Sequence, residues 1–323
     1  MASADVTLYG VIDTSIEVTN AGNGTAARID SGAATGSRYG LKGTEQLGDG
    51  NSVNFQLENG FYSNTGAAFD ATRAWSRQAW IGFANSNFGE VRVGRQHSPV
   101  YIPVVGRYDA FNDATLASAL NNFQVIDVRN DNAISYWSPD LSGFSAQVMV
   151  GLRPAQGQTG NGIDDSHFAI EYVRGPVSLA AAFQQAPNST ATSKIRNVYF
   201  GGSYLLGAVR IYGVYYRGRQ IDGTLDNQVA STSFEYFLSP TQVVSLGVGK
   251  VWDKTGHSRN ADEIGGMYRL ILSKTTTLYA DFGYLRNHGN STYTLNGAAI
   301  RGIPAAGPGV LVRGVQSGIV HYF

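Results

Sequence analysis

Cysteine is absent from the 323-residue sequence, which excludes disulfide frameworks, thiolate metal sites and cysteine nucleophiles. Charge is also scarce, because charged residues make up only 15% of the chain, and 24 Lys and Arg residues balance 24 Asp and Glu residues. A balanced charge provides no net field that would favour nucleic acid, so we expect no nucleic-acid partner. A disordered protein would carry more charge.

Long apolar runs are missing as well. The longest candidates, such as residues 178–183, fall far short of the roughly 18–20 residues that a membrane helix needs. This excludes helical spans but leaves a membrane barrel open, because barrel strands are individually weak signals. At the start, Ala2-Ser3-Ala4 fits the small-residue pattern before a signal-peptidase cut, and we interpret Met1 as the start of a nearly mature chain.

The apolar residues recur with a period of two, which is typical of β-strands. In residues 6–18 one face carries Val6, Leu8, Ile12, Ile16 and Val18, and the other carries Thr7, Tyr9, Asp13, Ser15 and Glu17. Residues 144–152, 197–206 and 209–219 repeat this alternation. The chain therefore predicts an all-β fold.

Turn signals allow the strands to be counted. Seven tight turns are predicted at 47–52, 84–90, 138–143, 173–177, 205–209, 238–242 and 272–276. Eight longer polar connections are predicted at 19–36, 59–72, 97–127, 152–166, 184–196, 217–228, 252–262 and 287–310. These fifteen connections predict sixteen strands, with both termini on the short-turn side, as in a bacterial outer-membrane barrel.

A soluble β-sandwich or β-solenoid is the alternative architecture. A sandwich of this size would usually divide into two domains, but no linker or change in composition interrupts residues 1–323. Tyrosine and tryptophan also recur at strand ends, as an interfacial girdle requires: Tyr9, Trp75, Trp80, Tyr136, Trp137, Tyr172, Tyr204, Tyr236, Trp252, Tyr268 and Tyr279. We therefore predict one domain, a 16-stranded antiparallel transmembrane β-barrel.

Several segments resemble the general diffusion porins of Gram-negative outer membranes, in particular the β-proteobacterial type. They are VTLYGVID (6–13), SRYGLKGTEQLGDG (37–50), RQAWIGF (77–83), FGEVRVGRQ (88–96) and the terminal HYF. The resemblance covers essentially the whole chain. It implies a homotrimer in the cell outer membrane, surrounded by lipid and lipopolysaccharide, with trimer contacts around the first strand. It also implies that the assembly machinery recognises Phe323.

The third long connection, residues 97–127, lacks the turn residues of its neighbours and carries many apolar side chains. The resemblance implies that this loop folds into the lumen, where one side must pack on the inner wall. Within it, residues 114–120 fit a short helical turn. Asp109 and Asp113 are the acidic residues expected to face the aperture, across from a basic wall.

Strand alternation places the basic residues of that wall. Arg38 alternates with Tyr39 and Leu41, and Arg129 with Ile134 and Tyr136; a charge facing lipid would cost about 2–4 kcal/mol, so both arginines are expected inside. Arg73 and Arg77 share a parity opposite to Gln78 and Trp80 and are also assigned to the constriction. Two alternatives stay open: Arg73 at a loop base contacting lipopolysaccharide phosphates, and Arg95 at the trimer interface.

These residues predict a water-filled channel for small hydrophilic solutes and ions, with a modest anion preference from arginines facing two aspartates. A porin selective for small anionic solutes would use the same arginines. An outer-membrane enzyme is less favoured, because the sequence has no G-x-S-x-G motif and its five histidines are scattered. A plugged structural barrel is the last alternative. We expect no catalytic residues, cofactor or metal.

Overall fold

The computed structural model describes residues 5–101, 107–153, 162–188 and 190–323, and Met1 and the triplet Ala2-Ser3-Ala4 lie outside them. One antiparallel sheet contains all the strands. They are β1 (Asp5–Asn20), β2 (Thr25–Ser31), β3 (Arg38–Gly48), β4 (Asn51–Gly60), β5 (Gln78–Asn85), β6 (Gly89–His97), β7 (Arg129–Trp137), β8 (Phe144–Leu152), β9 (Ile163–Arg174), β10 (Val177–Pro187), β11 (Lys194–Leu206), β12 (Val209–Gln220), β13 (Asp226–Ser239), β14 (Gln242–Asp253), β15 (Arg259–Ile271), β16 (Thr276–Gly289) and β17 (Leu311–Tyr322).

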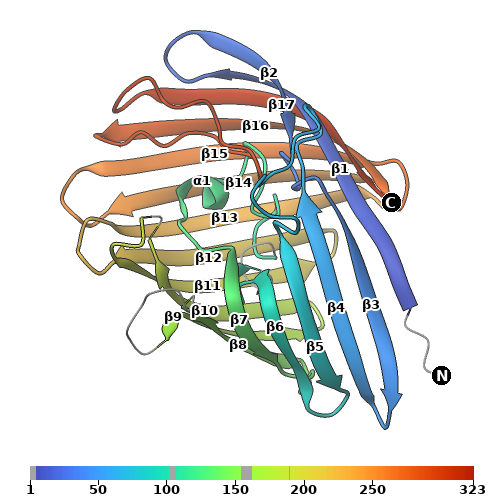
Figure 1. Cartoon of the computed structure of the whole chain (residues 1–323). Helices are drawn as coiled ribbons and strands as arrows, with labels where there is room; N and C mark the ends of the chain where they lie inside the picture. Colours follow the sequence, from blue (N-terminus) through green and yellow to red (C-terminus); the bar gives the residue numbers. More distant parts are fainter. Residues whose placement is uncertain (1–4, 102–106, 154–161, 189) are drawn as a thin grey trace.

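The sheet closes on itself because β1 pairs with β17 (Figure 1). β2 and β3 both pair with β1 and are separated by a break at residues 32–37, so together they make one strand of a sixteen-stranded barrel. The predicted fold class is therefore confirmed. The predicted long connection at 19–36 is wrong, because only residues 21–24 separate β1 from β2.

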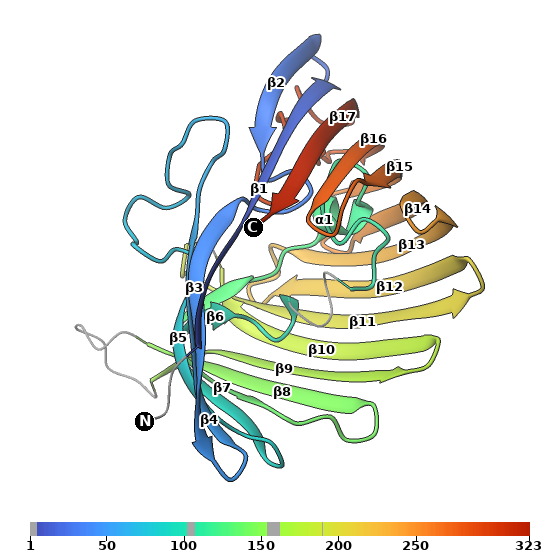
Figure 2. The same ribbon diagram turned by 90° about the vertical axis from the view of Figure 1, so that its right-hand side faces the viewer.

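The connections have the predicted asymmetry only in part. Tight turns join β3 to β4, β5 to β6 and each later pair at one rim. At the other rim, residues 61–77, 98–128 and 290–310 are long connections, but the predicted long connections at 184–196, 217–228 and 252–262 reduce to residues 188–193, 221–225 and 254–258. Two long loops that are described throughout are residues 61–77, much of which projects outside the barrel wall (Figure 2), and residues 290–310. Backbone hydrogen bonds of 2.9 and 3.1 Å between Gly10 and Phe323 tie the chain end to β1 at the short-turn rim.

The alternation of side chains sorts the barrel into an apolar outer face and a polar inner face. Ile16 is 61% exposed on the outside of β1, whereas Asp13 and Glu17 are fully buried on the inside. An apolar outer face and a closed sheet without free edges are what a membrane demands of a barrel. No helix among the described residues is long and apolar enough to cross a membrane.

The aromatic girdle is partly confirmed. Tyr136, Tyr204, Tyr236 and Tyr268 are exposed on the outer face, each near the end of a strand that leads into a tight turn. They form a belt at the short-turn rim, the place expected for amphipathic rings at a membrane surface. Other aromatic residues in the predicted set point inward: Tyr9, Trp80 and Tyr279.

The described parts of the segment between β6 and β7, residues 98–101 and 107–128, lie inside the barrel, where the helix α1 (Ala119–Phe123) is visible (Figure 1). Residues 102–106 of the predicted loop lie outside the described residues. The helical turn predicted at 114–120 overlaps α1 only in its last two residues. Leu116, Leu120 and Phe123 are completely buried against the wall, as the apolar sequence of the loop requires. Wall glycines make room for this contact, because a Cβ at Gly265 would overlap the backbone of Ala117. We refer to residues 98–128 as the constriction loop.

Candidate channel constriction

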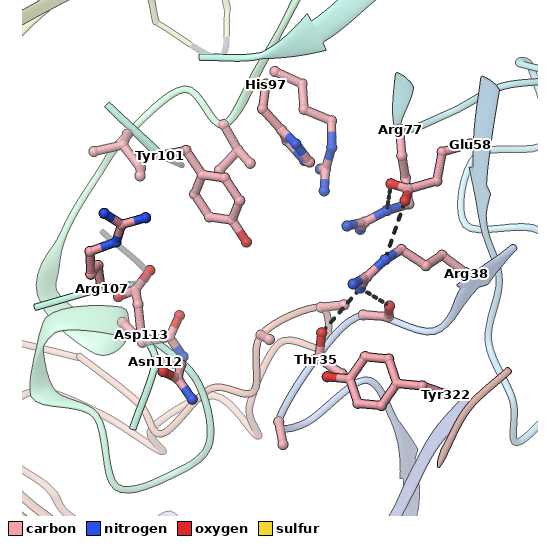
Figure 3. Close-up of a pocket in the computed structure, with 18 of the residues that line it drawn as sticks. Thr35, Arg38, Glu58, Arg77, His97, Tyr101, Arg107, Asn112, Asp113 and Tyr322 are labelled. Carbon is pink, nitrogen blue, oxygen red and sulfur yellow. Dashed lines mark hydrogen bonds and ion pairs between the residues drawn. The ribbon is translucent and has the colours of Figure 1, made fainter. Parts of the chain in front are cut away.

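The lumen contains a cavity of about 1280 Å³ beside the constriction loop (Figure 3). Both walls of the barrel and four connecting segments contribute to its lining. The charged residues of the lining are Arg38, Glu58, Arg77, Arg107, Asp113, Arg129, Arg210, Glu235, Arg269 and Arg301. The cavity is therefore polar and mainly basic.

On one wall, a buried glutamate holds two arginines. Arg77 Nε donates to Glu58 Oε1 at 2.7 Å, and Arg38 Nε lies 3.3 Å from Glu58 Oε2. Tyr9 also donates its hydroxyl to Glu58 Oε2 at 2.9 Å. In Figure 3 both guanidinium groups lie on the same side of the opening, facing the constriction loop. We call Tyr9, Arg38, Glu58 and Arg77 the Glu58 cluster.

The backbone explains how each arginine reaches the lumen. Arg38 is the first residue of β3, directly after the break in the strand, and its Nη1 donates to Gly36 O at 2.8 Å. Arg77 lies just before β5 rather than within it. The parity expected for β5 is wrong, because Gln78 and Trp80 face the lumen. Arg77 therefore escapes the alternation that would have turned it outward.

Arg129 is the first residue of β7 and lines the same cavity. It forms no ion pair with any residue that the structure describes, and its Nε is buried without a hydrogen-bond partner there. His97, at the end of β6, lines the same cavity and lies near Arg77 in Figure 3. The positive charge of Arg129 is therefore not neutralised locally, and it adds to the field of the Glu58 cluster.

The constriction loop supplies one carboxylate to the cavity rather than two. Asp113 lines the cavity, and its two oxygens each accept from Gln124 Nε2 at 2.6 Å. Burial raises the pKa of Asp113 well above its usual range, and the nearby Asp109 raises it further. Asp109 does not face the aperture as expected. It points to the wall, where Ser233 of β13 donates to it at 3.1 Å, and Ser118 of the loop donates to it at 2.5 Å.

Arg73 lies outside the channel, so its assignment to the constriction is wrong. It pairs with Asp131 at 2.8 Å and with Asp70 at 3.0 Å, and the first pair belongs to a groove on the outer face. Arg95 lies in the same groove and pairs with Asp131 at 2.6 Å, beside the exposed Val93. Loop 61–77 carries Arg73 beyond the barrel wall, where strand alternation gives no guidance.

The opposite wall carries a second group of charges that the sequence analysis missed. Arg269 and Tyr212 each donate to one oxygen of Glu235, and all three line the cavity with Arg210. We call Arg210, Tyr212, Glu235 and Arg269 the Glu235 cluster. Strand alternation contained the signal, because Ile211 and Tyr268 next to these arginines are exposed on the outer face.

The break in the second barrel strand and the last long loop also border the cavity. Ala33 O accepts from Thr115 N of the constriction loop and from Ala298 N of the last loop, both at 2.9 Å. Asn121 of α1 donates to Asn296 O at 2.9 Å. These bonds tie three segments together around the opening, and they bring Arg301 to its edge.

The lining charges favour negative solutes. Seven arginines (38, 77, 107, 129, 210, 269 and 301) face three carboxylates (58, 113 and 235), an excess of four positive charges on one surface. Rings of charge of one sign bias the choice of ion in a pore. Among the described residues, no group of His, Cys, Asp and Glu could hold a metal ion.

Comparisons with known proteins agree with this architecture. A family model described as Gram-negative porin matches residues 1–290. Outer membrane porin protein 32 of Delftia acidovorans is 30% identical over all of this chain and 95% of its own length. An outer membrane porin protein of Bordetella pertussis is 30% identical over 88% of this chain and 90% of its own length. The solved anion-selective porin from Comamonas acidovorans superimposes with a TM-score of 0.85 at 26% identity, covering 99% of this chain and 100% of that one.

Proposed function

Because the chain belongs to the Gram-negative porin family, we propose that it forms a water-filled channel with a modest anion preference for small hydrophilic solutes and ions. Its place is the outer membrane, where the short-turn rim faces the periplasm. The excess of four positive charges on the cavity lining carries the proposed selectivity. The similar porin from Comamonas acidovorans, described as anion-selective, supports the same preference.

Arg38, Arg77, Arg129 and Asp113 set the field of the constriction in this proposal. Arginine suits that role because its charge persists at any physiological pH and its fork of donors matches oxyanions. The guanidinium groups face the constriction loop across water, so a hydrated anion passes with its charge stabilised. A cation meets the same field as a barrier.

We propose that residues 1–323 act as one barrel domain that assembles as a homotrimer, with lipid and lipopolysaccharide on its outer face. Phe323 serves as the signal for the assembly machinery, and its exposed ring at the short-turn rim suits recognition from the periplasm. No catalytic step and no cofactor belong to this function. The cavity side chains act through their charge and their position.

Reconstitution in a planar bilayer tests this function. We expect conductance steps in groups of three, one for each subunit of a trimer, and a conductance that rises in proportion to the KCl concentration. Single steps would contradict the trimer. A complete lack of steps from correctly folded protein would contradict the open channel, and a conductance that saturates would contradict simple diffusion.

A further inference from the structure

The Glu235 cluster repeats the arrangement of the Glu58 cluster on the opposite wall. In each, a buried glutamate accepts from one tyrosine hydroxyl and from arginine: Tyr9 with Arg38 and Arg77 at Glu58, and Tyr212 with Arg269 at Glu235. Figures 1 and 2 show β3–β5 and β12–β15 on opposite sides of the barrel. The two clusters therefore present arginines to the same water-filled cavity from different directions.

Arg210 is the arginine that Glu235 does not neutralise. It lies directly opposite Glu235 in the pairing of β12 with β13. Glu235 Oε1 accepts from Arg269 and Oε2 from Tyr212, and neither oxygen forms an ion pair with Arg210. Among the described residues, Arg210 forms no ion pair, although it lines the cavity. Its guanidinium is therefore available to a solute.

The Glu235 cluster lies nearer the short-turn rim than the constriction loop does. Ser233 accepts from Ala110 N of the loop at 3.0 Å, and Glu235 follows two residues later on the same face of β13. Two residues of a strand span about 7 Å, so Glu235 lies that far below the loop toward the short-turn rim. Arg210 and Arg269 also lie within two residues of their strand ends at this rim.

We propose that Arg210 and Arg269 form a second anion-binding site, on the periplasmic side of the constriction, for small oxyanions such as inorganic phosphate. An anion that moves from Arg38, Arg77 and Arg129 toward the periplasm reaches this second site next. Two guanidinium groups beside one carboxylate leave a net positive charge there, and guanidinium donors suit oxyanions. This inference rests on the proposed channel, to which it adds a residence site and its two ligands.

Charge replacement at Arg210 and Arg269 tests the site. Because the chain has no cysteine, a thiol reagent modifies only the cysteine that a substitution introduces. R210C and R269C channels are treated with a cationic or an anionic methanethiosulfonate reagent. In about 0.1 M salt, a unit charge about 7 Å from the ion path changes the local concentration of a monovalent ion by about 1.6-fold. The change has opposite sign for chloride and potassium, so the ratio of their permeabilities changes by about two- to threefold. We expect each cysteine variant to lose about that factor in the chloride-to-potassium permeability ratio. The cationic adduct should restore the ratio, and the anionic adduct should lower it further.

Matched variants separate charge from folding. Arg286 lies exposed on the outer face of β16, away from the lumen. The permeability ratio of R286C channels should therefore change with neither reagent. R38C, in the Glu58 cluster, should respond to both. Equal permeability ratios for the two adducts at positions 210 and 269, in channels where R38C responds, would overturn the second site. If a cysteine variant does not fold, R210Q and R269Q give the same comparison without the adduct.

Inorganic phosphate probes the ligand itself. Added on the periplasmic side of wild-type channels, it should reduce the chloride current at a lower concentration than when added on the other side. R210Q/R269Q channels should need about two- to threefold more phosphate per lost charge for the same block from that side. Block that is equal from both sides and unchanged in the double variant would overturn the site. The proposed function fails separately, because it requires chloride preference in the wild type.

Discussion

The Glu58 cluster and the Glu235 cluster use one glutamate each, but they hold different numbers of arginines at different depths. Glu58 binds two arginines that face the constriction loop across the opening (Figure 3), and Glu235 binds one arginine nearer the short-turn rim. In both, the buried carboxylate fixes guanidinium groups that would otherwise move freely in water. Neither carboxylate neutralises every arginine near it, since Arg129 and Arg210 form no ion pair with a described residue.

The comparison shows what the carboxylates contribute. A buried ion pair adds little net stability, because the cost of desolvating both charges offsets their attraction. The ion pairs instead fix the positions of the guanidinium groups. Arg77 and Glu58 are nearly enclosed, with 10% and 4% of their side chains exposed, so the guanidinium is held in one orientation toward the water-filled opening. A fixed charge acts on a passing ion more effectively than a mobile one.

The largest expected effect comes from removing the arginines of the constriction. R38Q/R77Q/R129Q should lower the chloride-to-potassium permeability ratio by on the order of tenfold, as three unit charges near the ion path disappear. Reversal potentials in a KCl gradient measure the ratio. R73Q is the matched control, because Arg73 lies in the groove on the outer face. An unchanged ratio in the triple variant would place the selectivity elsewhere.

A smaller effect, of opposite sign, should follow from removing each carboxylate. E58Q and E235Q each delete one negative charge from the lining, so each should raise the permeability ratio by about two- to threefold. Each should also lower the free energy of unfolding by about 1–3 kcal/mol, because arginine donors lose a charged acceptor. Thermal unfolding and reversal potentials, measured together, separate these effects. A fall in the ratio would mean that the arginines need their glutamate to face the lumen.

The smallest effect should come from pH, through Asp113, the one carboxylate of the constriction loop that lines the cavity. Burial raises the pKa of Asp113, so this group gains a proton at a higher pH than an ordinary aspartate near 4 does. The proton removes a negative charge, and chloride preference should therefore rise as the pH falls. D113N should show the high preference at every pH. A response that survives in D113N would assign it to another group.

The fold could be predicted from the sequence because alternation and turn signals are local. The tight turns carry Gly, Asn, Pro or Ser, and outward residues such as Ile16 and Ile134 are apolar. The break at residues 32–37 was missed because its partners are distant in the chain. Ala33 O accepts from Thr115 and Ala298, neither of which the local sequence reveals.

The site was harder to predict for the same physical reason. Arg38 and Arg129 begin strands, so alternation placed them correctly, whereas Arg77 precedes its strand and reached the lumen despite a mistaken parity. Which loop aspartate faces the cavity depends on Ser233 of a strand far along the chain. Strand alternation would have predicted that Arg210 and Arg269 of the Glu235 cluster face inward. This cluster was missed because it lies outside the segments that resemble the porin family.

The zero-current potential of wild-type trimers across a KCl gradient tests the arginine excess most directly. Seven arginines against three carboxylates predict a potential with the sign of chloride. The same sign should hold at neutral pH and grow toward acidic pH. A potential with the sign of potassium would contradict the assignment of selectivity to these arginines, because carboxylates would then control the opening.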